Sequence, residues 1–190
     1  MKRSILALLF VASTLTAFAQ MGEVSLSFGD SMLRNSSLGI FNGVDVPSKS
    51  NFHMALRMTL NNSRYFGHEF GYAYNHASFN ASGTDYSMPI HQGFYDFLVY
   101  GTKEGTRIRP FAAGGGGFST FVPPGGSVLQ GSGMTKFGYN YGGGIKARVS
   151  EAFMIRADIR DYTTGKPDFG TSPSGLLHQL VVSAGLAFMF

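Results

Sequence analysis

Residues 179–190 of the chain read QLVVSAGLAFMF. From Leu180 to Phe190 every second residue is apolar, whereas the residues between them include Ser183 and Gly185. Strict alternation over this length predicts a β-strand with one apolar face and one mixed face. This final segment gives the pattern with which the rest of the chain can be compared.

The same alternation recurs throughout the sequence, and helical periodicity is nearly absent. Together with the final segment, the sequence predicts eight strands, at residues 23–32, 52–60, 65–78, 90–100, 107–121, 136–147, 153–160 and 179–190. The faces of the segment at 107–121 stay unassigned, because residues 112–117 are small on both sides. Alternation in so many short segments is typical of an all-β protein.

The connections between the segments alternate in length. The longer ones, at 33–50, 79–88, 122–134 and 163–176, all fall at one end of an antiparallel sheet, and the short turns at 61–63, 101–106 and 149–151 fall at the other. Long extracellular loops and short periplasmic turns are typical of bacterial outer-membrane barrels. The sequence therefore predicts an all-β fold, namely an eight-stranded antiparallel up-and-down transmembrane β-barrel with both chain ends on the periplasmic side.

Composition favours a barrel in a membrane over a soluble one. Charged residues make up 14% of the chain, whereas soluble domains carry about 25%. The apolar faces hold large aromatic residues near the strand ends, including Tyr72, Tyr139, Phe153 and Phe188, as interfacial girdles require. Strands of this length also fit a tilted crossing of an apolar band about 25 Å tall.

The opposite faces carry charged side chains, which we expect inside the barrel. Eight strands enclose a space just wide enough for side chains, so paired charges should fill it. Gly142, Gly144 and Gly185 leave room for the longest of them. The predicted interior charge cluster consists of Arg57, Glu69, Asp96, Lys146, Arg156, Asp158 and Arg160. Such a cluster is either a structural core of ion pairs or a path for protons or ions.

The N-terminal residues predict export from the cytoplasm. Lys2 and Arg3 precede an apolar run at residues 5–15, and Ala17-Phe18-Ala19 is a small-x-small cleavage signal. These parts in this order are typical of a secretory signal peptide, so we expect a signal peptide at 1–19, cleaved after Ala19, and the barrel domain at 20–190. Without Lys2 and Arg3 the chain has 13 basic and 11 acidic residues, a balance too weak to indicate nucleic acid.

Several motifs resemble those of the small outer-membrane β-barrel domain family, which includes opacity-type adhesins and the transmembrane part of outer membrane protein A. They are Arg109-Pro110-Phe111 with the glycines at 114–117, Gly142-Gly143-Gly144, the segment 156–162, and the C-terminal LAFMF. The resemblance covers essentially all of the mature chain. It implies a location in the cell outer membrane and contact with its lipid and lipopolysaccharide.

The resemblance also implies an assembly signal in the last strand, formed by Leu186, Phe188 and Phe190 and read by the outer-membrane assembly machinery. No peptidoglycan-binding domain follows Phe190, so we expect no cell-wall tether. The long loops would meet any surface partner.

Residues that could carry chemistry are few. His76-Ala77-Ser78 resembles the pair used by outer-membrane lipid A deacylases, with Asp85 as the nearest acid, although the position expected for the acid is near the apolar Ile90. The five histidines are scattered along the chain without metal-ligand spacing, and the chain has no cysteine. The glycines at 114–117 lack the Lys-Ser/Thr of a phosphate loop. We expect no metal, no cofactor and no catalytic residues.

The sequence thus predicts a non-enzymatic outer-membrane barrel with a structural, surface-presentation or adhesion role. Two alternatives remain at this point. One is an outer-membrane lipid A-modifying enzyme that uses His76 and Ser78. The other is a soluble periplasmic barrel that binds an apolar ligand, as lipocalins do.

Overall fold

The computed structural model describes residues 21–34, 40–41, 44–45, 51–81, 84–127, 129, 131, 133–167 and 175–190. The expected signal peptide, with Ala17 and Ala19, lies outside these residues. In the described part of the chain, no helix has the length and apolarity needed to span a membrane.

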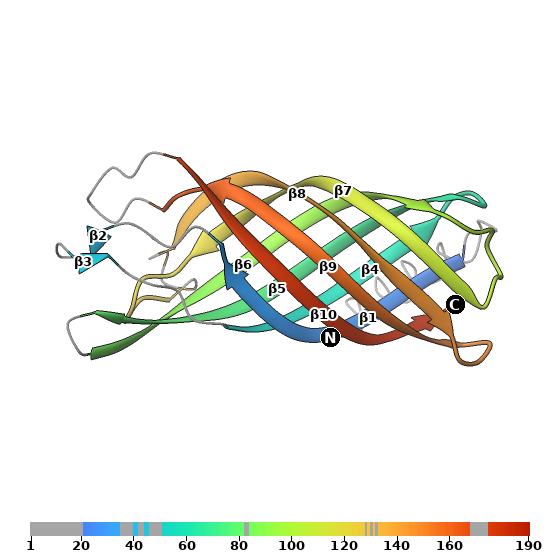
Figure 1. Ribbon diagram of the computed structural model, residues 1–190, viewed down its shortest axis with the longest axis horizontal. Helices are drawn as coiled ribbons and strands as arrows, with labels where there is room; N and C mark the ends of the chain where they lie inside the picture. The colour runs from blue at the N-terminus through green and yellow to red at the C-terminus, as the bar shows by residue number, and fades with distance from the viewer. Residues whose placement is uncertain are drawn as a thin grey trace, which may run out of the picture.

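Eight long antiparallel strands close into a barrel (Figure 1). They are β1 (Met21–Leu33), β4 (Asn51–Asn61), β5 (Phe66–Ala81), β6 (Thr84–Tyr100), β7 (Ile108–Phe121), β8 (Met134–Arg148), β9 (Phe153–Gly165) and β10 (Leu176–Met189). Each strand pairs with its neighbours in sequence, and β1 also pairs with β10. The predicted eight-stranded up-and-down barrel is therefore confirmed.

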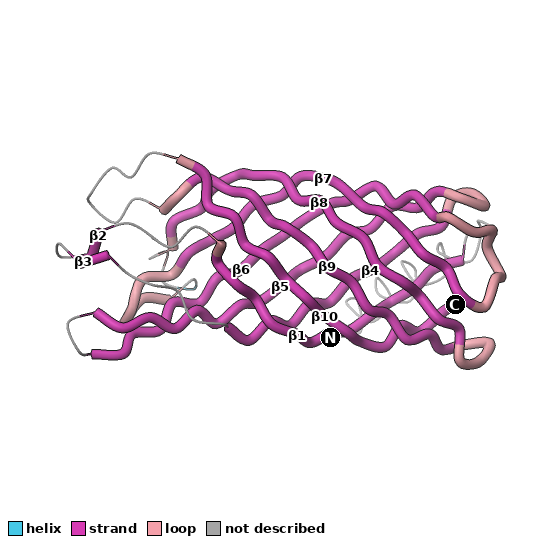
Figure 2. Tube along the Cα trace, viewed as in Figure 1, coloured by secondary structure: helices cyan, strands magenta, loops and turns pink. Residues whose placement is uncertain are grey.

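Short turns join the strands at one end of the barrel, on the right in Figure 2, where the C-terminus also lies. The opposite end carries the longer connections. Within one of them, β2 (Ile40–Phe41) and β3 (Val44–Asp45) form a separate two-stranded sheet. This arrangement matches the expected periplasmic turns and extracellular loops.

The barrel wall is apolar outside and polar inside. Along β10, Val182, Leu186 and Phe188 are exposed, whereas Gln179 and Ser183 are buried. The same alternation holds along β4, and along β9 as far as Arg160, beyond which residues 161–164 are all buried. Since a soluble protein of this kind would turn its apolar face inward, the burial pattern is that of a protein surrounded by lipid.

Strand β7, whose faces the sequence left unassigned, turns Arg109, Phe111 and Ser119 into the lumen. Ile108 and Phe118 lie on the outer surface. The glycines between them allow close packing, because a β-carbon on Gly115 would lie 2.5 Å from Oδ1 of Asp96. The run of small residues is thus where the inward side chains of β6 press against the wall.

The seam between the first and last strands is closed at the periplasmic end by Phe190. Its backbone N and O each bond to Gly22 at 3.0 Å. A β-carbon on Gly22 would lie 2.6 Å from the Phe190 ring, so the glycine provides the space that the ring occupies. The aromatic end of the chain therefore packs directly against the strand that it joins.

One expectation about the connections is wrong. Residues 79–88 were expected to form a loop, but β5 and β6 continue pairing as far as Ala81 and Thr84. Pairing of β5 with β4 ends at His76, and pairing of β6 with β7 ends at Ile90. Beyond these residues the two strands form a ribbon that projects past the barrel rim, green at the lower left of Figure 1.

Candidate functional site

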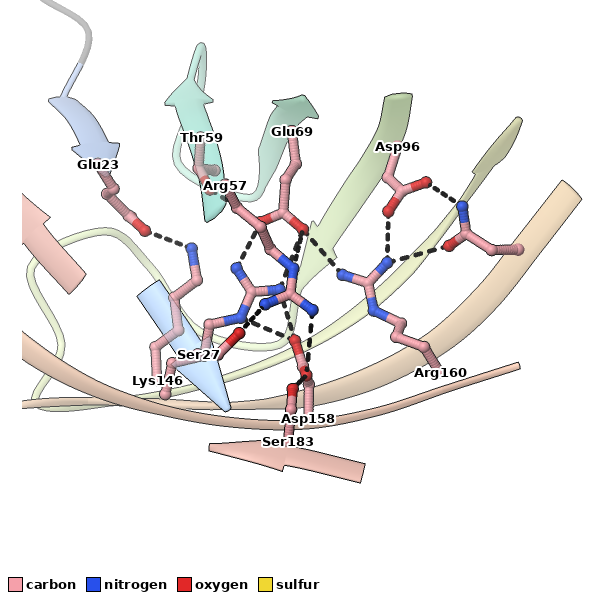
Figure 3. A network of polar contacts seen from close by, with 12 residues as sticks. Glu23, Ser27, Arg57, Thr59, Glu69, Asp96, Lys146, Asp158, Arg160 and Ser183 are labelled. Carbon is pink, nitrogen blue, oxygen red and sulfur yellow. Dashed lines mark hydrogen bonds and ion pairs between the residues drawn. The ribbon is translucent and has the colours of Figure 1, made fainter. Parts of the chain in front are cut away.

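The lumen holds a network of ion pairs at the level of Glu69, which extends from β5 (Figure 3). Oε1 of Glu69 accepts from Arg156 Nη2 at 3.0 Å and from Arg160 Nη2 at 3.0 Å. Nε of Arg57 lies 3.7 Å from the same oxygen. One carboxylate on one strand is therefore shared by three arginines from β4 and β9.

Two aspartates complete this network. Arg156 Nη2 lies 2.7 Å from Oδ2 of Asp158, and Arg57 Nη2 lies 3.7 Å from its Oδ1. Arg160 pairs with Asp96 on β6. The network then balances three positive charges with three negative ones, and all six side chains are at most 5% exposed. Buried charges are tolerated when they are paired in this way.

The structure thus brings together six of the seven residues expected in the interior charge cluster. The seventh, Lys146, is also buried but belongs to a separate pair. Its Nζ bonds to Glu23 and, at 3.0 Å, to the hydroxyl of Tyr100. Asn61 Nδ2 donates to the other oxygen of Glu23 at 2.7 Å. Sequence reasoning had missed Glu23, although it shares a strand face with the inward Ser25 and Ser27.

Aromatic rings lie against the arginines of the lumen. The Arg156 guanidinium lies 4.9 Å from the centre of the Phe111 ring, and the Arg109 guanidinium lies 3.4 Å from the Tyr100 ring. Cations bind the faces of such rings favourably where water is excluded. Glycine provides the space, since a β-carbon on Gly142 would lie 2.8 Å from Cδ of Arg160.

A second polar layer, made mainly of uncharged side chains, crosses the lumen nearer the extracellular end. Asn75 Oδ1 accepts from His53 Nδ1 at 2.7 Å, and Asn75 Nδ2 donates to Gln92 at 2.8 Å. Gln92 donates to Ser119 and Gln179, each at 3.0 Å, and Gln179 donates to Ser31 at 2.6 Å. We call these six residues the amide belt. It connects side chains from six of the eight strands.

Apolar side chains close the lumen beyond the amide belt. Six buried residues from five strands pack there, namely Leu33, Ala77, Met88, Ile90, Phe121 and Leu177. Between the two polar layers, Phe94 packs edge-on to Tyr162 with ring centres 5.7 Å apart. A cavity lined by Gln92, Asn140 and Tyr162 measures only about 10 Å³, the space of roughly one water molecule. In the described part of the chain, side chains therefore fill the lumen at these levels.

The residues considered for catalysis lie elsewhere. His76 and Ser78 share the outer face of β5, as their spacing predicted. His76 Nδ1 contacts the Tyr74 hydroxyl at 3.3 Å, and among the described residues no hydrogen bond joins it to Ser78. The side chain of Asp85 lies outside the described part. Within that part, no group of three or more metal-ligating side chains is found.

A closed barrel with an apolar outer wall and an ionic interior defines a membrane-spanning β-barrel of the outer-membrane class. The chain belongs to the outer membrane protein beta-barrel domain family, whose family model matches residues 4–190. The protein is accordingly located in the outer membrane. The alternative of a soluble barrel with an apolar ligand cavity is wrong, because the lumen is filled with paired charges and amides.

Solved structures show the same fold at low sequence identity. Neisserial surface protein A is 11% identical with a TM-score of 0.65, and the match covers 90% of this chain and 97% of that one. OprG from Pseudomonas aeruginosa is 11% identical with a TM-score of 0.60 over the same shares. Ail, the attachment invasion locus protein of Yersinia pestis, is 12% identical with a TM-score of 0.55, covering 91% and 100%. No curated protein matches the sequence.

Proposed function

We propose that this protein is a non-enzymatic barrel whose lumen is a structural core and whose function lies at the cell surface, in envelope structure, surface presentation or adhesion. The observation that supports this best is the filled lumen, in which an ion network, an amide belt and an apolar cluster succeed one another. A solute would have to displace buried ion pairs, which is costly.

The extracellular end is the remaining place for a specific activity. The ribbon of β5 and β6 projects there beyond the rim. One relative by fold, Ail, is an attachment invasion locus protein whose structure was determined with the heparin analogue sucrose octasulfate. An adhesive role for the loops and ribbon of this chain is therefore the form of the proposal that we favour.

Two measurements test the proposal, one on the purified, refolded protein and one on cells. Single-channel recording of the refolded protein should show no conductance, because the lumen is filled. Cells that display the protein should bind a host surface more than cells that display a variant whose ribbon is shortened by removing residues 79–86. Steady conductance, or equal binding by the two forms, would argue against the proposal.

The alternative of a lipid A-modifying enzyme has its own test. His76→Ala should leave the lipid A of expressing cells unchanged relative to the wild type, because neither protein should alter it. Release of an acyl chain by the wild type alone would favour the enzyme.

We also propose that Leu186, Phe188 and Phe190 form the assembly signal. Removal of Phe190 should lower the yield of folded protein in the outer membrane of cells, because the ring and its backbone bonds to Gly22 are lost. Normal membrane yield of the shortened chain would contradict this assignment.

A further inference from the structure

Basic side chains gather on the periplasmic turns. Arg64 lies in the turn after β4, Lys103 and Arg107 lie in the turn after β6, and Arg148 ends β8. The first three are exposed and Arg148 is half-buried. None of these residues belongs to the charge network of the lumen. We call the four residues the basic arc.

Two hydrogen bonds link the elements that carry the basic arc. Arg109 Nη2 donates to the carbonyl oxygen of Arg64 at 3.1 Å, which joins the first turn to β7. The backbone N of Arg148 donates to the carbonyl oxygen of Arg107 at 2.8 Å. The arc therefore follows the rim from β4 to β8.

Acidic residues neutralise the arc only in part. Glu104 lies in the same turn as Lys103; it is half-buried and interacts electrostatically with the buried Arg109 and with Arg148, the half-buried member of the arc. Burial also raises the pKa of the Glu104 carboxyl. Glu151 is the other acid of the described turns, and it lies toward β9. The exposed charge along the arc is thus predominantly positive.

Apolar side chains border the arc on the side of the membrane. Tyr65, Phe66, Ile108 and Val149 are each within two residues of a member of the arc, and they are 39%, 43%, 59% and 64% exposed. Aromatic and basic residues at one level are typical of the boundary between hydrocarbon and headgroups. A ligand for this surface needs a negative headgroup with an acyl chain beside it.

We propose that the basic arc binds anionic phospholipid headgroups of the inner leaflet of the outer membrane. Tyr65 and Phe66 would contact the upper part of the acyl chain, while Arg64, Lys103 and Arg107 approach the phosphate. Each basic side chain near an anionic lipid surface strengthens binding about fivefold. A soluble anionic polymer would use the charges but leave the apolar border unused.

The proposal is tested in nanodiscs that contain phosphatidylcholine and phosphatidylglycerol. After mild release from the disc, native mass spectrometry counts the lipids of each kind that remain bound to the protein. The test variant is Arg64→Gln/Lys103→Gln/Arg107→Gln. The control is Arg34→Gln/Lys136→Gln/Lys166→Gln, which removes the same charge from the extracellular end.

The wild type and the control should retain phosphatidylglycerol in preference to phosphatidylcholine, and the test variant should lose at least about tenfold of that preference. Equal preference in all three proteins, or an equal loss in both variants, would overturn the proposal. If the test variant does not fold, as judged by equal migration of unheated and boiled samples on an SDS gel, two measurements replace it. They are the lipid preference of Lys103→Gln and that of the wild type at raised salt. Preference unchanged by both would likewise overturn the proposal.

Discussion

Leu56 and Arg57 are adjacent in β4, yet they lie in opposite surroundings. Leu56 is 53% exposed on the outer wall, and Arg57 is 1% exposed between Glu69 and Asp158. In a soluble protein the leucine would be buried and the arginine solvated. The pair shows that lipid stabilises the wall by accepting apolar side chains, while the lumen must satisfy its charges internally.

The strongest test exchanges these two residues. The variant Leu56→Arg/Arg57→Leu keeps the composition but places a charge in the hydrocarbon and leaves Glu69 and Asp158 with one arginine fewer. We expect the free energy of unfolding to fall by at least about 5 kcal/mol, which is enough to prevent folding. On an SDS gel, the exchanged protein should migrate at the same position with and without boiling. The wild type should migrate at different positions before and after boiling. A folded band from the exchanged protein would contradict the assignment of the faces.

The next largest effect concerns the lumen alone. Glu69→Gln leaves Arg57, Arg156 and Arg160 with only two carboxylates, and breaking a buried ion pair costs about 3–5 kcal/mol. Urea unfolding in lipid vesicles, followed by the loss of folded gel mobility, should show this decrease. Glu151→Gln, an exposed turn residue, serves as the control and should be nearly neutral. Equal stability of both variants would mean that the network contributes little.

A comparable test concerns the wall alone. Leu56→Arg should destabilise the barrel by about 2–4 kcal/mol if this position is near the middle of the bilayer. Leu56→Ala, which adds no charge, should cost much less in the same urea assay. An arginine tolerated as well as the alanine would place Leu56 at the membrane boundary.

The amide belt should be weaker than the ion network. Gln92→Leu removes the partner of Asn75, Ser119 and Gln179, and each buried polar group left without a partner costs about 1–3 kcal/mol. We expect a smaller decrease than for Glu69→Gln, measured under identical conditions. The reverse order would show that the amides, and not the charges, hold the lumen together.

The smallest effect is expected where polar groups meet on the wall. Tyr95→Phe removes a hydroxyl that bonds to His68 Nδ1 at 2.6 Å. Only this one hydrogen bond is lost, so the free energy of unfolding should fall by about 0.5–1.5 kcal/mol. A loss as large as that of Gln92→Leu would indicate that this hydrogen bond is screened from water.

The strand faces could be predicted because a lipid-facing wall tolerates few charges. Arg156, Asp158 and Arg160 alternate with Ile155, Ala157 and Ile159, and only one assignment keeps the charges out of the hydrocarbon. Strand β7 offered no such contrast at residues 112–117. Its inward and outward faces could be assigned only from its pairing with β6 and β8. The pairings between charges could not be predicted, because they depend on which strands lie opposite across the lumen.

The amide belt went unrecognised for a different reason. Asn75 lies an even number of residues from the inward Glu69, and Gln92 lies an even number of residues from the inward Asp96. Both amides therefore share the inward faces of their strands, and their direction could have been inferred. Uncharged amides, however, are common in loops and on surfaces, and a short sequence pattern does not single them out. The ribbon at 77–89 was missed because Asn, Ser and Gly within residues 79–88 favour a turn. Pairing between the two strands overcame that local preference.

The ribbon has a mechanical consequence for a protein at the cell surface. Its strands continue without interruption into the wall, where β5 pairs with β4 over residues 67–76 and β6 pairs with β7 over residues 90–100. A force applied to the tip along the barrel axis would shear the hydrogen bonds between β5 and β4 and those between β6 and β7. Because these bonds are loaded in parallel, many of them would have to break at once.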